Sequence, residues 1–220
     1  MDKINESSGT VFTRRTVFFQ LVAGVLAGFL NYVFSSSMLK LGIPLFMDTI
    51  FTAAASCFGL LCGILAAISS HIVSFVIAGF SFPEDASNMV FVFCSLTVVL
   101  GMRILIHLSE KREFSVSPLH LFALGIMMAL VISIEGALFY VLLLKYSEYV
   151  IDNKAVSTLI YTLITQKVSL IASSTLARIP VNMVDKLIAV FAGWYLAKLV
   201  NKLANMVTLC KNKEETWQRK

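Results

Sequence analysis

The stretch RIPVNMVDKLIAVFAGWYLAK, residues Arg178–Lys198, decides the fold expected for this chain. It has the apolar character and the length of a helix that crosses a bilayer, for which about 20 residues are needed. Near one end, however, it carries Asn182, Asp185 and Lys186. Pro180 suits the first turn of such a helix, where its missing N–H costs nothing. Because ionisable groups at membrane depth are expensive, these side chains are candidates for a functional site.

Helical spacing brings these polar residues together. Asn182 and Lys186 are four residues apart and share one face of a helix, and Asp185 flanks that face. Two interpretations remain open. The residues either contact a ligand, or Asp185 forms an ion pair with Lys186 or Arg178 that only holds helices together.

The composition places the chain in a membrane. Of its 220 residues, 58% are hydrophobic and 14% are charged, whereas soluble domains have about 45–50% apolar and about 25% charged residues. We expect an all-α integral membrane protein with one membrane domain over residues 16–204. The polar segment 1–15 precedes it, and the apolar run that follows is too long for the core of a signal peptide. Residues 205–220 form a basic tail.

Apolar stretches predict six transmembrane helices. Their approximate bounds are 16–36, 46–59, 62–80, 88–107, 119–144 and 179–200. The second and third come from one apolar run, residues 47–80, which would be about 50 Å long as a single helix and therefore too long for one crossing. Gly59 and Gly63 are the expected break.

Residues 155–177 are harder to interpret, because they are mostly apolar but rich in Ser and Thr, with Lys167 in the middle. Cytoplasmic segments of membrane proteins carry an excess of Lys and Arg. Six spans with both termini in the cytoplasm place most of the basic residues inside, whereas a seventh span would move the basic tail outside. We therefore expect a six-helix bundle, with residues 155–177 as an outer lid or a buried hairpin. The net charge of +5 then sets the orientation, and no nucleic-acid partner is expected.

Other polar groups fall near the same predicted outer side. Glu135 is the single acid of the fifth span and must be protonated, paired or wetted. Asn31 either contacts the bound molecule or joins two helices by a hydrogen bond. Asp48 either caps the start of a helix or contacts the bound molecule. Helical rise places Lys186 about 9 Å and Glu135 about 15 Å below the outer end. We predict an outward-facing cup whose substrate-binding residues are Asn31, Asp48, Glu135, Asn182, Asp185 and Lys186.

No enzyme motif is present: the chain has no HExxH, GxSxG or P-loop pattern. We expect no catalytic residue, no metal and no cofactor. A membrane enzyme remains an alternative and predicts turnover that is lost on Glu135→Gln. Cys57, Cys62, Cys94 and Cys210 form no CxxC pair, which favours structural thiols.

The first span carries small residues at helical spacing, Ala23 with Ala27 and Gly24 with Gly28. Small residues four apart let a neighbouring helix approach closely within lipid. That neighbour is either another helix of this chain or a partner subunit.

Three stretches resemble the substrate-binding (S) subunits of energy-coupling factor (ECF) transporters. They are Gly42–Ile72, Arg178–Leu196 and the AGVLAG segment of the first span. The resemblance implies that the chain captures a vitamin or similar micronutrient at the outer face of the cell membrane. It also implies docking on a transmembrane coupling subunit, through Ala23 and Ala27, and on two cytoplasmic ATPase subunits. A sensory membrane module of similar fold is the alternative.

Two departures from the family bear on the ligand. Riboflavin-binding members place an Asn and a Lys three residues apart at the start of the last helix. Here Asn182 and Lys186 are four apart, and Asp185 stands where that lysine would be, which argues against riboflavin. The tryptophan-rich cage of thiamine binders is missing, since the only tryptophans are Trp194 and Trp217.

Overall fold

The computed structural model describes residues 17–77, 89–146 and 154–218, with side chains up to residue 206. The predicted segment 1–15 lies outside these residues, as do parts of the predicted spans 62–80 and 88–107 and the end of the basic tail. Within them, every regular element is a helix and there is no β-strand. The all-α prediction is confirmed.

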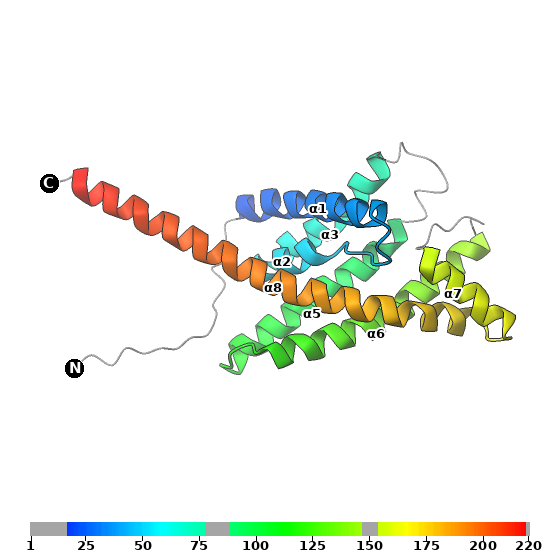
Figure 1. Ribbon diagram of the computed structural model, residues 1–220. Coiled ribbons are helices and arrows are strands. Elements are labelled where there is room, and N and C mark those ends of the chain that lie inside the picture. The colour runs from blue at the N-terminus through cyan, green and yellow to red at the C-terminus, as the bar shows by residue number, and fades with distance from the viewer. Residues whose placement is uncertain (1–16, 78–88, 147–153, 219–220) are drawn as a thin grey trace.

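Seven α-helices and one short 3₁₀-helix make up the described part of the chain (Figure 1). They are α1 (Val17–Lys40), α2 (Ile50–Phe58), α3 (Leu60–Ile77), η1 (Met89–Phe91), α5 (Val92–Lys111), α6 (Pro118–Tyr146), α7 (Lys154–Thr165) and α8 (Leu170–Gln218). Four of them, α1, η1 continued by α5, α3 and α6, are long and apolar enough to cross a membrane. The chain is therefore a membrane protein, but the predicted count of six spans is not confirmed.

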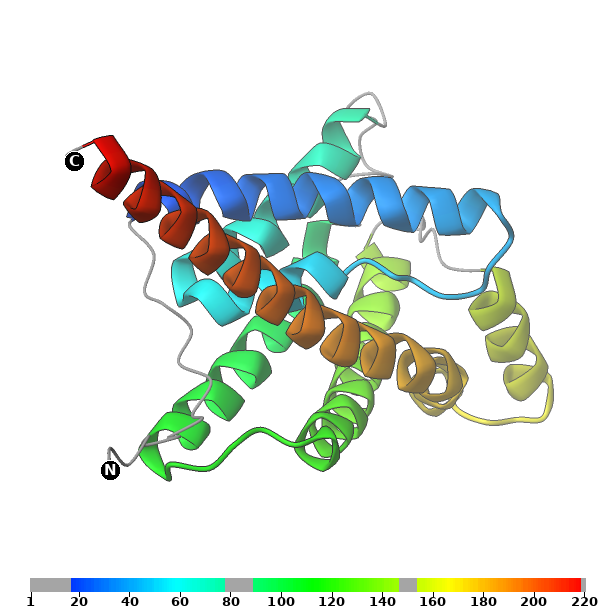
Figure 2. The ribbon, with the colours of Figure 1, turned by 60° about the vertical axis from the view of Figure 1, so that its left-hand side comes forward.

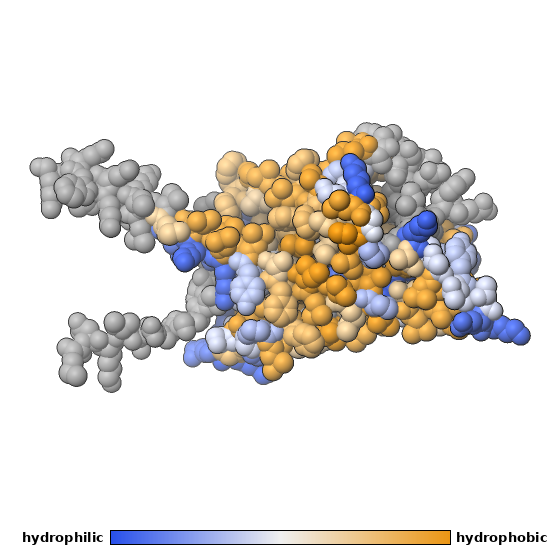
Figure 3. Space-filling view, in the orientation of Figure 1, coloured by the Kyte–Doolittle hydropathy of each residue, from blue (hydrophilic) through white to orange (hydrophobic). Residues whose placement is uncertain are grey.

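The surface has the distribution of side chains that lipid requires. Large apolar residues such as Phe18, Val25, Leu130 and Ile134 are exposed on the long helices. Figure 3 shows hydrophobic side chains over the middle of one face, with hydrophilic ones gathered toward the two ends. In water such a surface would be unfavourable, and in a bilayer it is the expected exterior.

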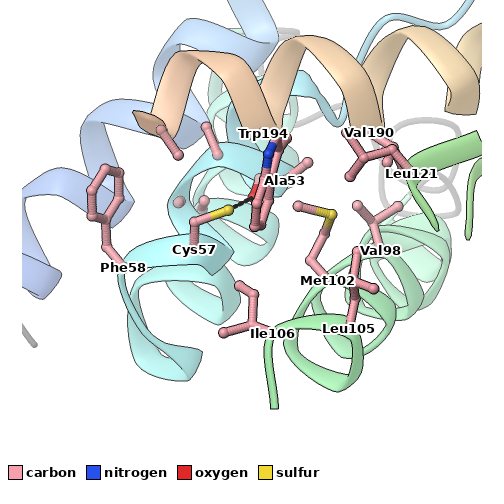
Figure 4. Close-up of a cluster of buried hydrophobic side chains, with 14 of the residues drawn as sticks. Ala53, Cys57, Phe58, Val98, Met102, Leu105, Ile106, Leu121, Val190 and Trp194 are labelled. Atoms are coloured by element: carbon pink, nitrogen blue, oxygen red, sulfur yellow. Dashed lines mark hydrogen bonds between the residues drawn. The ribbon is translucent and has the colours of Figure 1, made fainter. Parts of the chain in front are cut away.

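Helix α8 contacts three other helices, α6, α2 and α7. It packs along α6 and α2, while α1 packs along α3, so segments far apart in sequence are neighbours. Figure 4 shows Trp194 of α8 between Ala53 and Cys57 of α2 and the α5 side chains Val98 and Met102. Close packing at this junction depends on Gly193, because an added Cβ would lie 2.6 Å from Ala53 Cβ.

The predicted break between the second and third apolar stretches occurs at Gly59, between α2 and α3. The two helices fold back on each other, and a Cβ on Gly63 would lie 3.1 Å from the Cα of Ser56. At about 1.5 Å per residue, the nine residues of α2 cover only about 14 Å. Helix α2 by itself is therefore shorter than the hydrocarbon core of a bilayer, which is about 30 Å thick.

Helix α8 differs from its predicted bounds at both ends. The sequence predicted a span over 179–200 followed by a separate tail at 205, but one helix runs from Leu170 to Gln218 with Pro180 inside it. Its C-terminal part extends past the other helices (Figure 2). Proline has helical φ and removes one backbone donor, and a membrane helix tolerates this when its neighbours satisfy the freed group.

The stretch 155–177 is neither a complete lid nor a buried hairpin. Its first part is α7, which packs against α8 through Val156 and Ile160. A turn with Lys167 in the left-handed region (φ 63°) then leads into the first turns of α8. The Ser- and Thr-containing sequence 170–175 is thus part of the last helix, where the hydroxyls of Ser173 and Thr175 donate to the carbonyls of Val168 and Ile171.

Candidate functional site

A polar stripe runs along one face of α8. Arg178, Asn182 and Lys186 follow each other at intervals of four residues, and all three are buried. Asn182 Nδ2 donates to Ser133 Oγ of α6 at 2.9 Å. The guanidinium of Arg178 donates to Ser174 and lies over the ring of Tyr140, 4.8 Å from its centroid. The predicted shared face of Asn182 and Lys186 is therefore present, and Arg178 extends it by one turn.

Lys186 lies at the centre of an ionic cluster. Its Nζ lies 2.6 Å from Asp185 Oδ2 and 3.3 Å from Asp48 Oδ1, and it donates to Thr49 Oγ1 at 3.1 Å. Two of the three N–H donors of the ammonium are directed at Asp48 Oδ1 and Thr49 Oγ1, and the short contact with Asp185 Oδ2 is an ion pair that lacks hydrogen-bond geometry. Lys186 and Asp185 are buried, whereas the Asp48 side chain is 39% exposed. The predicted pairing of Asp185 with Lys186 is observed.

The same cluster supports the linker between α1 and α2. Met47 N–H donates to Asp185 Oδ1 at 2.6 Å, and Ser35 Oγ donates to the Phe46 carbonyl at 2.6 Å. Met47 has φ of 50°, a left-handed conformation that is uncommon without glycine. Non-helical backbone at membrane depth is tolerated only where its polar groups are satisfied inside the protein. Asp185 therefore has a structural contact in addition to its ion pair.

Asn31 joins α1 to the start of α2. It is fully buried, its Nδ2 donates to Thr52 Oγ1 at 2.7 Å and its Oδ1 accepts from Phe51 N–H at 2.9 Å. The first N–H groups of a helix have no partner within it, so Asn31 satisfies one of them. Of the two roles that the sequence left open for Asn31, these hydrogen bonds show the one that joins two helices.

A cavity of about 320 Å³ lies beside these groups, between the second halves of α1 and α3 and the first half of α8. Hydroxyl, amide, charged and aromatic side chains line it. The lining residues are Asn31, Tyr32, Ser35, Ser36, Leu39, Phe46, Asp48, Ser70, His71, Ser74, Phe91, Cys94, Ile132, Gly136, Arg178, Asn182 and Lys186. Pockets for small molecules are typically about 300–1,000 Å³, so this cavity is large enough for a compact metabolite.

The predicted site residues divide into two groups. Four of the six, Asn31, Asp48, Asn182 and Lys186, line the cavity. Asp185 is not among the lining residues and contacts Lys186 and Met47 instead. Glu135 is also absent from the lining, and both its carboxylate oxygens accept from Thr97 Oγ1, at 2.8 and 3.0 Å.

The small residues of α1 face the interior of the chain. A Cβ on Gly24 would lie 2.7 Å from the carbonyl oxygen of Cys62, and one on Gly28 would lie 2.7 Å from that of Ala66. Ala23 and Ala27 are half-buried against the central core. The glycines thus serve the contact within the chain, and docking of a partner on Ala23 and Ala27 stays a prediction.

Sequence reasoning missed several cavity residues, among them Arg178, His71 and Tyr32. Arg178 has the spacing that could have revealed it, four residues before Asn182. His71 forms a hydrogen bond with Ser95 Oγ at 3.1 Å, and it also lines the cavity.

Among the described residues, no group of three or more His, Cys, Asp and Glu side chains is arranged to hold a metal ion. Cys57, Cys62 and Cys94 are free thiols. Cys57 donates to the carbonyl of Ala53 one turn earlier, at 3.5 Å. All three thiols lie within helices, and Cys94 also lines the cavity.

Fold and site together define a class: a helical membrane protein with a partly open cavity lined by polar, charged and aromatic side chains. Comparisons of the chain with protein-family models, with curated proteins and with solved structures give no match.

Proposed function

We propose that this chain is a membrane-embedded binding subunit that captures a small, water-soluble micronutrient for uptake into the cell. One observation carries the proposal: a cavity lined by polar and charged side chains lies inside an otherwise apolar helix bundle. Keeping such groups inside a membrane protein is costly, and they mark substrate pathways or ligand sites. The hydroxyl, amide and charged residues of the lining come from α1, the linker after it, α3 and α8. The site therefore exists only in the assembled bundle.

The transport assembly in this proposal follows the resemblance to ECF S subunits. The chain would cross the plasma or inner membrane six times, with both termini in the cytoplasm, and bind its ligand from outside. The start of α1 and the end of α8 lie at the same end of the bundle (Figure 1), which supports termini on one side. A transmembrane coupling subunit and two ATPase subunits would supply the energy, because no nucleotide-binding motif occurs in this sequence.

Binding is tested with the purified chain in detergent. Small molecules released by heating are identified by mass spectrometry, and water-soluble vitamins are screened for an increase in the temperature of unfolding. A ligand bound only by the folded state raises that temperature by an amount that grows with the logarithm of its concentration relative to Kd. We expect at least one compound to bind with a Kd well below millimolar. If no compound is released and none stabilises the chain, the proposal is wrong.

A variant that fills the cavity tests whether the compound binds there. Ser74 lines the cavity at an exposed position of α3, so Ser74→Trp should fold normally while filling the site. We expect the affinity for the identified compound to fall by about tenfold or more. Ser37→Trp is the control, since Ser37 is also exposed near the end of α1 but is not among the lining residues. Equal losses in both variants would argue against this cavity as the site.

A further inference from the structure

The charges of the ionic cluster do not balance. One ammonium, that of Lys186, faces two carboxylates, those of Asp48 and Asp185. With both acids ionised, the cluster carries one more negative than positive charge. In a bundle of low dielectric constant an excess charge is costly unless another group compensates for it.

The geometry shows which carboxylate presents the excess charge. Asp185 is fully buried, lies 2.6 Å from Lys186 Nζ and also accepts the Met47 N–H, so its charge is committed to internal contacts. Asp48 lies 3.3 Å from the ammonium, is 39% exposed and lines the cavity. The negative potential at this end of the cavity therefore comes from Asp48.

Aromatic side chains of the cavity favour the same kind of ligand. Tyr32, Phe46 and Phe91 line it together with Asp48, and the faces of aromatic rings attract cations. Arg178 opposes a cation, but it precedes Lys186 by eight residues on α8, which is about 12 Å along the helix axis. The α8 position that pairs with Asp48 and the one that carries the guanidinium are thus about two helical turns apart.

Building on the proposed function, we propose that the ligand is an organic cation, a protonated amine or a quaternary or heteroaromatic ammonium, whose charged group binds at Asp48. The ligand then supplies the positive charge that the Lys186 cluster lacks. The remainder of the molecule lies against the hydroxyls of Ser70 and Ser74 and the amide of Asn182.

The test compares charged and uncharged molecules of the same shape. Choline is measured against its uncharged tert-butyl analogue, and pyridoxamine against pyridoxine, by stabilisation of the purified wild-type chain. The molecule released from the protein by heating is identified by mass spectrometry and measured in the same way. We expect the released molecule to be a cation, or the charged member of a pair to bind at least about tenfold more tightly than the uncharged one.

Asp48→Asn is the decisive variant. It removes the excess charge and leaves the ion pair of Lys186 with Asp185 intact, so the fold should persist. Losing a charge partner of this kind typically weakens binding by about 30-fold or more. Glu110→Gln is the matched control, because it removes an exposed carboxylate near the end of α5 that lies outside the cavity lining, and it should bind like the wild type.

The outcomes separate this inference from the function on which it rests. If the protein binds an acid or a neutral molecule, or if Asp48→Asn binds a cation as tightly as the wild type does, the cation inference is wrong and the binding function stands. If nothing is released and no compound stabilises the chain, both are wrong. The wild-type comparison decides the question even if Asp48→Asn does not fold.

Discussion

Replacing Lys186 by methionine is expected to destabilise the protein by about 3–5 kcal/mol, the usual cost of removing one partner of a buried ion pair. Methionine fills a similar volume, so the loss reflects charge. Asp185, fully buried, would keep a carboxylate whose cation is gone. Asp48 is less affected because it is partly exposed. The measurement is the free energy of unfolding in mixed detergent micelles titrated with SDS.

The double variant Lys186→Met with Asp185→Asn identifies the cause. An asparagine at position 185 retains an oxygen that can accept the Met47 N–H, which Asp185 Oδ1 accepts at 2.6 Å, but carries no charge. We expect it to recover most of the stability lost in the single variant. If the single variant is as stable as the wild type, or the double variant is no more stable than the single one, the cluster is not the ionic structure described above.

Adding one methyl group at Gly193 is expected to destabilise the junction of α2 and α8 by about 1–3 kcal/mol, as overpacking of a well-packed core does. The Cβ of Gly193→Ala would lie 2.6 Å from Ala53 Cβ and 2.9 Å from both Ala54 N and Ile50 O. Two of these atoms belong to backbone, so the helices must move apart. The gain in helix propensity from Gly to Ala, about 0.5–1 kcal/mol, offsets only part of the cost.

Gly101→Ala is the control for this prediction. A Cβ there would meet Met128 Cε and, at 3.2 Å, Leu124 Cδ1. The nearest contact is the flexible end of a methionine, which can change rotamer. We expect Gly101→Ala to be neutral or slightly stabilising in the same SDS titration. Similar losses in both variants would show that helix separation at Gly193 is not the cause.

Composition and helical spacing predicted the class of fold and part of the site. The long apolar runs predicted membrane helices, and the interval of four residues placed Asn182 and Lys186 on one face. Glycine marked the break at Gly59. These features are local, and a single sequence contains the physical information that determines them.

The position of Glu135 could not be predicted in this way. In a soluble helix the polar face shows which side meets water, but the face of α6 toward lipid and the face toward the bundle are both apolar. Ile132 and Gly136 line the cavity, and Glu135 is one position away, rotated by about 100° toward Thr97 of α5. The depth of Glu135 along α6 can be estimated from the sequence of that helix alone. The direction in which its side chain points depends on the neighbouring helices.

Pairings over long sequence distances were also hidden. Met47 and Asp185 are 138 residues apart, and nothing in either segment alone identifies the other. The same limit applies to α8, which continues through Pro180 because α7, α6 and α2 pack against it. A proline near an expected helix start is compatible with two structures, and only tertiary contacts distinguish them.

The hydrogen bond from Met47 to Asp185 has a consequence for how the protein is made. The linker before α2 emerges from the ribosome long before the helix that satisfies it, because synthesis proceeds from the N-terminus. Until α8 has been inserted, the Met47 N–H and the short helix α2 lack their final partners. Packing of the earlier helices is therefore completed only after the last helix has been inserted. A nascent chain that stops before α8 exposes this polar segment to chaperones and proteases of the membrane.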